Sequence, residues 1–481
     1  MVGLGPGSAE HLTRRAWRAL QDADALYLRT NRHPAVAELP TTEQYISFDD
    51  IYEAHSRFDD VYAQITARLL DAARRGESPV YAVPGDPLVG EATVTRLLPL
   101  AAQANLPVEI IHGLSFIEPC LAQLQIDALD GLQILDALEI AAAYHPLTNP
   151  ALPALLAQVY SRGVASDLKL TLMNQYPDTF PVKLLHAAGT DAALVEALPL
   201  YEIDRSPHIG VMTALFLPQL DALSSFQSLQ NIIAQLRSPA GCPWDRKQTH
   251  QSLRPFLIEE AYEMLEALDT SDPAALCEEM GDLLLQIALH TQIAVDEGEF
   301  QMADVLRQLN QKLIRRHPHI YADVEVAGDS DKVARNWEDI KRAEKATLAG
   351  SSRSILDGIP KMAPALLVAY RYSARVAKVG FDWEDVQGVI AKAHEEWGEI
   401  FSAESDAARA LEIGDLIFVL ANWLRWLGVD DPESLMRSIN AKFYQRFRYV
   451  EEQALARGLA LSDMSLAQLE AWWQQAKQLE K

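Results

Sequence analysis

The sequence has few cysteines and no long apolar run. Its 481 residues include three cysteines, Cys120, Cys242 and Cys277, which are too few for a disulfide framework and match no zinc motif. Charged residues or prolines interrupt every apolar stretch before it reaches the roughly 20 residues that cross a bilayer. The segment MVGLGPGSAEHLTRR lacks the apolar core of a signal peptide. These absences predict a soluble cytoplasmic protein with no membrane partner.

Basic residues are scarce as well. The chain has 42 lysines and arginines against 67 acidic residues, and its formal net charge is −25 at pH 7. Because nucleic-acid binding needs a basic surface for the phosphate backbone, this balance argues against nucleic acid as a partner. It is compatible with an enzyme of small nucleotides, if a divalent cation and a few basic side chains receive the phosphates. The length allows two to four domains, each with its own core.

Some of the acidic residues are spaced so that they converge. Residues 255–282 contain two helical signatures, Glu259-Glu260-x-x-Glu263 and Glu278-Glu279-x-x-Asp282. Residues three apart share one helix face, and between the signatures Asp272 is the expected N-cap and Pro273 the expected first helical residue. Four converging carboxylates cannot all stay ionised without a cation, and oxygen-only ligation favours Mg²⁺ or Mn²⁺. The alternative is a solvated acidic face, but apolar neighbours such as Leu265 favour a metal site.

The same pattern occurs a second time. Its acidic signatures are Glu395-Glu396-x-x-Glu399 and Glu412-x-x-Asp415. A basic helical motif follows each set, Asn310-x-Lys312-x-x-x-Arg316 after the first and Asn440-x-Lys442-x-x-x-Arg446 after the second. Lysine and arginine four residues apart share a helix face, as contact with phosphate oxygens requires. GCPWD at 241–245 is echoed by VGFDW at 379–383, so these features indicate a duplication.

These motifs resemble the MazG family of nucleoside triphosphate pyrophosphohydrolases. The family signature, EExxE followed by ExxD, occurs twice, and SPAGCPWDRKQTHQSL, RRHPHIYAD, NWEDIK and VGFDW extend the likeness from about residue 226 onward. The resemblance implies a Mg²⁺-dependent (or Mn²⁺-dependent) enzyme that converts an NTP or dNTP and water to the monophosphate and pyrophosphate. It also implies a homodimer or larger homo-oligomer. The catalytic and metal-binding residues would be Glu260, Glu263, Glu279, Asp282, Glu396, Glu399, Glu412 and Asp415.

The two copies differ in residues that suit nucleotide binding. Lys392 lies one turn before the second acidic set, where the first copy has Phe256, and Trp473 lies near the end of the sequence. Against the second copy, Leu411 stands where the first copy has Glu278. We expect the second copy to be the more complete nucleotide site, with the base stacked on Trp473. The expected substrate-binding residues are Lys392, Asn440, Lys442, Arg446 and Trp473, together with Lys312 and Arg316 in the first copy.

The first half of the chain alternates strand-like and helix-like segments. Strands are expected at residues 1–4, 80–83 and 108–111, and helices at 8–24 and 59–75. This order predicts an α/β fold with a mostly parallel sheet, whose ligands bind beyond the carboxyl ends of the strands. A glycine-rich turn overlaps the end of the first strand, and another follows each of the other two strands.

These turns, GLGPG, PGDPLVG and HGLSFIE, resemble the tetrapyrrole methylase family, as do LQILDALEIA and HAAGTDAALVEALPLYEID. The resemblance covers about residues 1–220 and implies two α/β lobes with S-adenosylmethionine in the cleft between them. An alternative function is therefore an S-adenosylmethionine-dependent methyltransferase with a MazG-like accessory module. A non-catalytic helical dimerisation protein is a third interpretation, which the acidic signatures in both copies argue against. The expected cofactor-binding residues are Gly5, Gly7, Gly85, Asp86 and Pro87.

The sequence thus predicts a multidomain protein, with a two-lobed α/β part followed by all-α tandem modules. The methylase-like domain is expected at residues 1–221, the first MazG-like module at 226–348 and the second at 353–481. A linker at 222–227 and a polar hinge at 350–354 set these boundaries.

Overall fold

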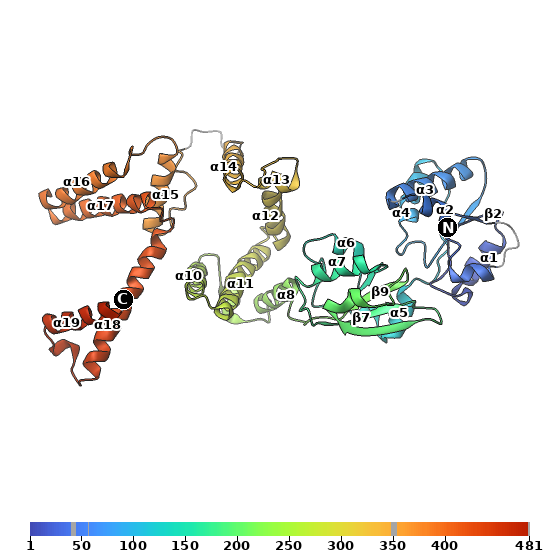
Figure 1. Ribbon diagram of the computed structural model, residues 1–481, viewed down its shortest axis with the longest axis horizontal. Coiled ribbons are helices and arrows are strands. Elements are labelled where there is room, and N and C mark those ends of the chain that lie inside the picture. Colours follow the sequence, from blue (N-terminus) through green and yellow to red (C-terminus); the bar gives the residue numbers. More distant parts are fainter. Residues whose placement is uncertain (40–44, 56, 348–353, 480–481) are drawn as a thin grey trace. The chain divides into compact units, whose positions relative to one another are not determined.

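The computed structural model describes residues 1–39, 45–55, 57–347 and 354–479. Its internal contacts divide the chain into two compact units, Met1–Gln308 and Leu309–Lys481. Figure 1 labels the helices and strands along the chain. Apart from Ser354, the predicted hinge at 350–354 lies outside the described residues, and the division into three domains stays a prediction. Within the described ranges, no helix combines the length and the apolar character that a membrane span requires.

The first lobe, residues 1–111, is built on a four-stranded parallel sheet. Its core includes Phe48, Ile65, Tyr81 and Val94, which are all buried. The predicted parallel sheet is therefore confirmed for this lobe. The strands, in spatial order, are β1 (Val2–Gly3), β4 (Pro79–Val83), β2 (Ala25–Leu28) and β3 (Ile46–Ser47). The helices are α1 (Arg14–Gln21), α2 (Asp49–Ala54), α3 (Phe58–Arg74) and α4 (Ala92–Gln103).

Two elements of this lobe differ from the prediction. The helix expected at 8–24 is divided, because the extended backbone of Thr13 ends the preceding turn and its side chain caps α1. The strand expected at 108–111 is reduced to a single bridge between Ile111 and Val2. The preceding proline has no N–H to donate to a ladder, which limits the pairing of that segment.

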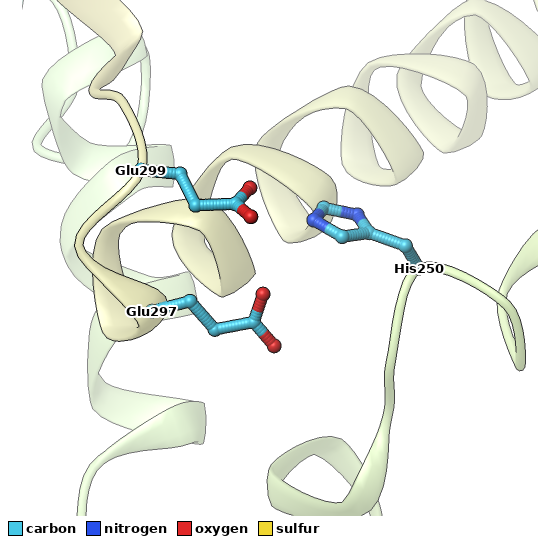
Figure 2. A group of neighbouring side chains, drawn as sticks. All are labelled: His250, Glu297 and Glu299. Atoms are coloured by element: carbon cyan, nitrogen blue, oxygen red, sulfur yellow. The ribbon is translucent and has the colours of Figure 1, made fainter.

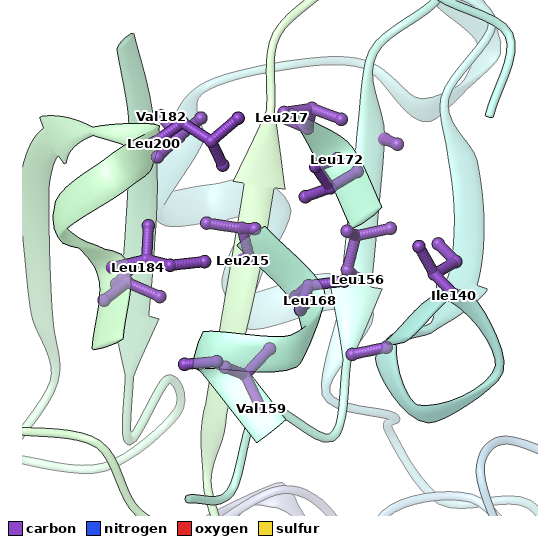
Figure 3. Close-up of a cluster of buried hydrophobic side chains, with 14 of the residues drawn as sticks. Ile140, Leu156, Val159, Leu168, Leu172, Val182, Leu184, Leu200, Leu215 and Leu217 are labelled. Atoms are coloured by element: carbon purple, nitrogen blue, oxygen red, sulfur yellow. The ribbon is translucent and has the colours of Figure 1, made fainter. Parts of the chain in front are cut away.

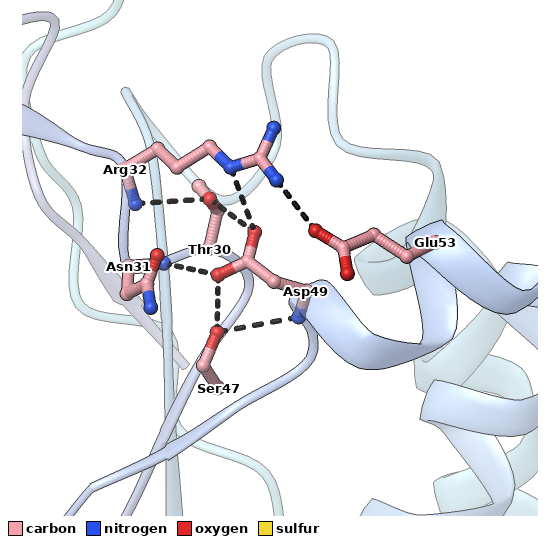
Figure 4. A network of polar contacts seen from close by, with 6 residues as sticks. All are labelled: Thr30, Asn31, Arg32, Ser47, Asp49 and Glu53. Atoms are coloured by element: carbon pink, nitrogen blue, oxygen red, sulfur yellow. Dashed lines mark hydrogen bonds and ion pairs between the residues drawn. The ribbon is translucent and has the colours of Figure 1, made fainter.

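A polar network joins the end of β2 to the start of α2 (Figure 4). The hydroxyls of Thr30 and Ser47 donate to the Asp49 carboxylate at 2.7 and 2.5 Å, and the Asn31 N–H donates to it at 2.7 Å. Burial alone would raise the pKa of Asp49, but these hydrogen bonds and the nearby Arg32 hold it below its ordinary value. The ionised carboxylate thereby fixes the loop that follows β2.

The second lobe, residues 117–217, holds a mixed five-stranded sheet. Only β5 and β6 pair in parallel, and the other pairs are antiparallel. The predicted mostly parallel sheet is wrong here, because β7 and β8 follow one another through a short connection that forms a hairpin. Figure 3 shows the apolar core, in which Leu168 and Leu172 of α7 pack with Leu156, Leu184 and Leu215 of the sheet. The elements are α5 (Ile117–Leu124), β5 (Gln133–Asp136), α6 (Ala137–Ala141), β6 (Ala154–Ala157), α7 (Arg162–Leu172), β7 (Pro181–His186), β8 (Leu194–Pro199) and β9 (Thr213–Leu217), with sheet order β5-β6-β9-β7-β8.

The remainder of the first unit is helical. The Asp272 carboxylate accepts hydrogen bonds from the N–H groups of Ala274 and Ala275 at 2.9 and 3.3 Å, and Pro273 is the first helical residue. The predicted cap between the two acidic helices is confirmed. The helices are α8 (Phe226–Arg237), α9 (Pro243–Lys247), α10 (Arg254–Thr270), α11 (Pro273–Glu297) and α12 (Met302–Arg316), and the boundary between the two units falls within α12.

The described part of the second unit is also helical and contains no strand. Its α16 and α17 pack against each other through Val389, Ala393 and Val419. The predicted all-α region is confirmed. After α12, the helices are α13 (Pro318–Tyr321), α14 (Ser330–Thr347), α15 (Ala365–Ala377), α16 (Val386–Ser402), α17 (Asp406–Trp426), α18 (Pro432–Leu455) and α19 (Leu466–Leu479).

Candidate active site

The first acidic set is brought together by α10 and α11. Glu260 on α10 and Glu279 and Asp282 on α11 each offer a carboxylate oxygen, and these oxygens lie within 4.8 Å of one another. Burial and the charge of Asp282 raise the pKa of Glu260, while burial and the charge of Glu263 raise that of Glu279. Glu263 lies outside the group of three, but its charge acts on both glutamates. The helix pair therefore concentrates negative charge at one point.

The second acidic set is arranged in the same way on α16 and α17. One oxygen each from Glu396, Glu399 and Glu412 lies within 4.8 Å of the others, whereas Asp415 is exposed and lies outside this group. Glu396 is 6% exposed, which makes it the most buried of these acids. Burial and the charges of Glu396 and Glu412 raise the pKa of Glu399. Both copies thus repeat the geometry of three close carboxylates from two packed helices.

Only the second copy has a lysine within its acidic set. The Lys392 ammonium lies 2.8 Å from the Glu396 carboxylate and 2.9 Å from that of Glu395. Hydrogen bonds to these two acids raise the pKa of Lys392, so it stays charged. In the first copy the corresponding residue is Phe256, whose ring lies edge-on to Trp244 at 5.9 Å. A cation therefore offsets part of the acidic charge in the second copy.

The basic motif of each copy lies beside a tryptophan. Arg446 lies over the Trp473 ring at 5.8 Å, and Arg316 lies over the Trp337 ring at 5.3 Å. Trp337 was not paired with Arg316 from the sequence, since it stands at a different distance along the chain from its arginine. It weakens the argument that tryptophan stacking distinguishes the second copy. The other predicted basic-motif residues, Lys312 on α12 and Asn440 and Lys442 on α18, are exposed.

Arg316 already has a strong ionic partner. Its guanidinium donates to Glu344 at 2.6 and 3.1 Å, and Arg315 donates to the same carboxylate at 2.6 Å. Hydrogen bonds from Arg316 and Arg315 lower the pKa of Glu344 to about 2. A phosphate would have to compete with this carboxylate for Arg316.

In the first lobe, the predicted glycine turns meet at the carboxyl ends of β1 and β4. Gly5 and Gly85 exchange two backbone hydrogen bonds, of 3.2 and 2.8 Å, and both have positive φ. A Cβ on Gly3 would lie 2.4 Å from the Gly85 carbonyl oxygen, so the two backbone segments are too close for any side chain at position 3. A Cβ on Gly7 would lie 2.2 Å from the carbonyl oxygen of Gly189 in the second lobe. Gly7 therefore lies where the two lobes meet.

The Asp86 side chain fixes the second glycine turn. Its carboxylate accepts from the Leu88 N–H at 2.8 Å and lies 2.8 Å from His112 Nδ1. Asp86 and the adjacent Pro87 are buried. Because His112 follows the bridge that pairs with β1, this contact joins the second and third glycine turns.

Two families account for these features. A model of the tetrapyrrole (corrin/porphyrin) methylases matches residues 1–204, and a model of the MazG nucleotide pyrophosphohydrolase domain matches residues 248–321. The nucleoside triphosphate pyrophosphohydrolase/pyrophosphatase MazG of Thermotoga maritima is 44% identical over 254 residues, which cover 52% of this chain and 95% of that protein. The chain belongs to the MazG family.

The MazG region is fused to a tetrapyrrole methylase domain, as the sequence predicted. The protein YabN of Bacillus subtilis is 42% identical over 490 residues, which cover 100% of this chain and 98% of that protein. The nucleoside triphosphate pyrophosphohydrolase of Escherichia coli K12 is 40% identical over 264 residues, or 54% of this chain and 99% of that protein. A crystal structure of uroporphyrin-III-C-methyltransferase from Thermus thermophilus, 21% identical, covers 46% of this chain and 94% of its own, with a TM-score of 0.37.

The donor chemistry of both MazG acidic sets fits a hard divalent cation. Each set offers carboxylate oxygens alone, the ligands that Mg²⁺ and Mn²⁺ prefer. The raised pKa values of Glu260, Glu279 and Glu399 show that their charged forms lack full compensation within the protein. A bound cation would supply that compensation.

We predict that Glu260→Gln raises the melting temperature of the metal-free protein at pH 8. A carboxyl group whose pKa is raised by folding stabilises the fold below its unfolded pKa of about 4.3, and this contribution is lost as the pH rises through the folded value. The gain should therefore be absent at pH 4. The melting temperatures are measured by circular dichroism in EDTA at both pH values. The exposed Glu384→Gln is the control. A lower melting temperature for Glu260→Gln at pH 8 would contradict charge repulsion in the first set.

Proposed function

We propose that the protein is a Mg²⁺-dependent nucleoside triphosphate pyrophosphohydrolase, which converts an NTP or dNTP and water to the monophosphate and pyrophosphate. Support comes from the two groups of close carboxylates and from the names of the MazG relatives. When bound, Mg²⁺ offsets charge on the phosphates and lowers the pKa of an attached water. The protein supplies the oxygens that hold the cation and the basic side chains that orient the triphosphate.

We place the nucleotide site in the second copy. The observation that carries this choice is Lys392, whose ammonium lies 2.8 Å from Glu396 at the acidic group. If a cation binds the carboxylates, the three N–H donors of Lys392 become available to a phosphate oxygen beside it. The proposed metal ligands are Glu396, Glu399 and Glu412, with Asp415 completing the set after a change of side-chain rotamer.

The remaining roles in the second copy follow from the chemistry of the side chains. Lys442 and Arg446 lie on one face of α18 and suit the β- and γ-phosphates, while Asn440 offers a neutral hydrogen bond. Trp473 presents a ring for stacking on the base, and Arg446 already packs on it. Glu395, held by Lys392, is the acid we assign to orienting the attacking water. In the first copy, Phe256 replaces the lysine and Glu344 holds Arg316, so this copy is the weaker nucleotide site.

We also propose that the methylase domain binds S-adenosylmethionine. The glycine turns end adjacent parallel strands, where ligands of α/β folds bind. Gly85 is partly exposed there, and the atom nearest to a Cβ built on it is 3.8 Å away. The Asp86–His112 contact adds a fixed polar group at this edge. This binding function is additional to the hydrolase activity and does not specify a methyl acceptor.

A homodimer or larger homo-oligomer is the assembly that we propose. The acidic helices expose large apolar side chains: Trp397 is 57% exposed and Phe401 and Leu411 are each 71% exposed. An array of this kind on one helix pair is typical of a surface that a partner covers. A second pair of helices from another copy would complete a four-helix core around the acids.

The first prediction from this function compares the two acidic sets. Glu396→Gln and Asp415→Asn should each lower Mg²⁺-dependent pyrophosphate release on the order of 100-fold, because the cation that compensates the phosphate charge is lost. Glu260→Gln and Asp282→Asn should lower the rate of pyrophosphate release by a smaller factor. Rates are measured for all four variants with a nucleotide panel, and circular dichroism checks the fold. The reverse ranking would assign catalysis to the first copy, and four wild-type rates would exclude both acidic sets as the metal site.

For the methylase domain, we predict that Asp86→Asn and Gly85→Ala weaken S-adenosylmethionine binding about tenfold or more. The first removes a charged hydrogen-bond acceptor, and the second strains a backbone with φ of +66°. Calorimetry measures the affinity, with Gly163→Ala as control, since a Cβ there meets only the Ser161 hydroxyl at 3.8 Å. A folded wild-type protein that binds no S-adenosylmethionine would contradict the proposal.

For the assembly, we predict that Trp397→Asp shifts the protein toward monomer. An aspartate at this position cannot be buried in an interface unless an ionic or hydrogen-bonding group compensates its charge, so the oligomer should dissociate. Multi-angle light scattering at micromolar concentration measures the mass. Leu129→Asp, at a site 93% exposed in the second lobe, should leave the mass unchanged. A wild-type monomer with full activity would refute the oligomer.

A further inference from the structure

We propose that His250, Glu297 and Glu299 form a separate binding site for a divalent transition-metal ion. One nitrogen of His250 and one oxygen of each glutamate lie within 4.8 Å of one another. Figure 2 shows the imidazole and the two carboxylates turned toward a common point. His250 comes from the loop before α10, and the glutamates come from the carboxyl end of α11 and the residue after its cap. The site therefore joins two segments that are far apart in sequence.

This site is distinct from the first acidic set, although both use α11. Asp282 of the acidic set lies in the first half of α11, and Glu297 is the last residue of that helix. At about 1.5 Å of rise per residue, they are separated by roughly 22 Å along the helix axis. One ion cannot serve both groups, and a change at one leaves the ligands of the other in place.

A buried arginine positions the loop that carries His250. The Arg237 side chain, 8% exposed, pairs with Asp296 at 2.8 Å and donates to the carbonyl oxygens of Asp245 and Gln248 at 2.5 and 3.3 Å. Gln292 donates to the other Asp296 oxygen at 2.9 Å. The loop is thus tied to the end of α11, and both oxygens of Asp296 are engaged. Asp296 is therefore not available to a metal, whereas the neighbouring acids Glu297 and Glu299 face His250 (Figure 2).

The His250 ring is also oriented for ligation. Its Nδ1 lies 2.8 Å from Nδ1 of His290, and the two rings stack with centroids 5.1 Å apart. One of these nitrogens donates and the other accepts, so at least one ring is neutral. With His290 as acceptor, Nε2 of His250 keeps its lone pair for the metal. Ligating histidines commonly use their second nitrogen in this way, to hold the ring in place.

The donor set indicates the class of ion. One imidazole with two carboxylates suits Zn²⁺, Mn²⁺, Fe²⁺ or Co²⁺, whereas Mg²⁺ prefers oxygen alone. The carboxyl end of a helix also carries partial negative charge, so Glu297 and Glu299 are unfavourably placed without a cation. Atoms bound to one ion at about 2.1 Å lie within about 4.2 Å of each other, which is close to the 4.8 Å within which these ligand atoms lie.

Equilibrium dialysis with Co²⁺ as the probe tests the site. The full chain, stripped of metal, should bind one more Co²⁺ per chain than His250→Ala and than the double variant Glu297→Gln/Glu299→Gln. His290→Ala should weaken this Co²⁺ by about 10- to 100-fold, since it removes the group that holds the ligand ring. Circular dichroism confirms that the variants are folded, and the exposed double variant avoids disturbing the His250–His290 pair.

Two controls separate this site from the acidic sets and from general histidine binding. Glu260→Gln should retain the His250-dependent Co²⁺, because it lies in the other group. His145→Ala, an exposed histidine in the second lobe, should also retain it. Equal Co²⁺ stoichiometry in wild type, His250→Ala and the double glutamate variant would overturn the proposal.

Discussion

The repulsion between carboxylates that packed helices bring together is the constraint on which this structure depends. In each copy, two packed helices place three acidic oxygens within 4.8 Å of one another. Burial and neighbouring charges raise the pKa of Glu260 and Glu399, so the folded protein holds negative charge that a nearby positive charge would stabilise. In the second copy, Lys392 compensates part of this negative charge. A divalent cation would supply the remaining positive charge, and a bound triphosphate would share that cation with the carboxylates.

The two halves of the chain use opposite means to receive a ligand. The MazG helices present charged side chains on rigid neighbouring elements. The methylase domain instead removes side chains: glycines at positions 3, 5 and 85 let adjacent strand ends approach until backbone meets backbone. Anionic phosphates suit the first arrangement, and a ligand held by backbone groups suits the second.

Local patterns in the sequence predicted the features that depend on short spacing. The Asp272 cap and Pro273 follow from helix geometry and are confirmed. Of the acids three residues apart, Glu279 with Asp282 and Glu396 with Glu399 lie in the close groups, whereas Glu263 and Asp415 do not. The antiparallel strands of the second lobe were not predicted, because the pairing of β7 with β9 depends on tertiary contacts. The contact of Trp337 with Arg316 was not predicted, because the spacing of these two residues differs from that of Trp473 and Arg446. The His250 group joins residues 250, 297 and 299, and no spacing rule relates ligands so distant in sequence.

We propose that the carboxylate groups hold a cation for cleavage between the α- and β-phosphates. Phosphorus NMR of nucleoside triphosphates incubated with the full chain and Mg²⁺ tests it most directly. We expect monophosphate and pyrophosphate in equal amounts, with no reaction in EDTA. Nucleoside diphosphate and orthophosphate as the main products, or an unchanged rate in EDTA, would contradict it.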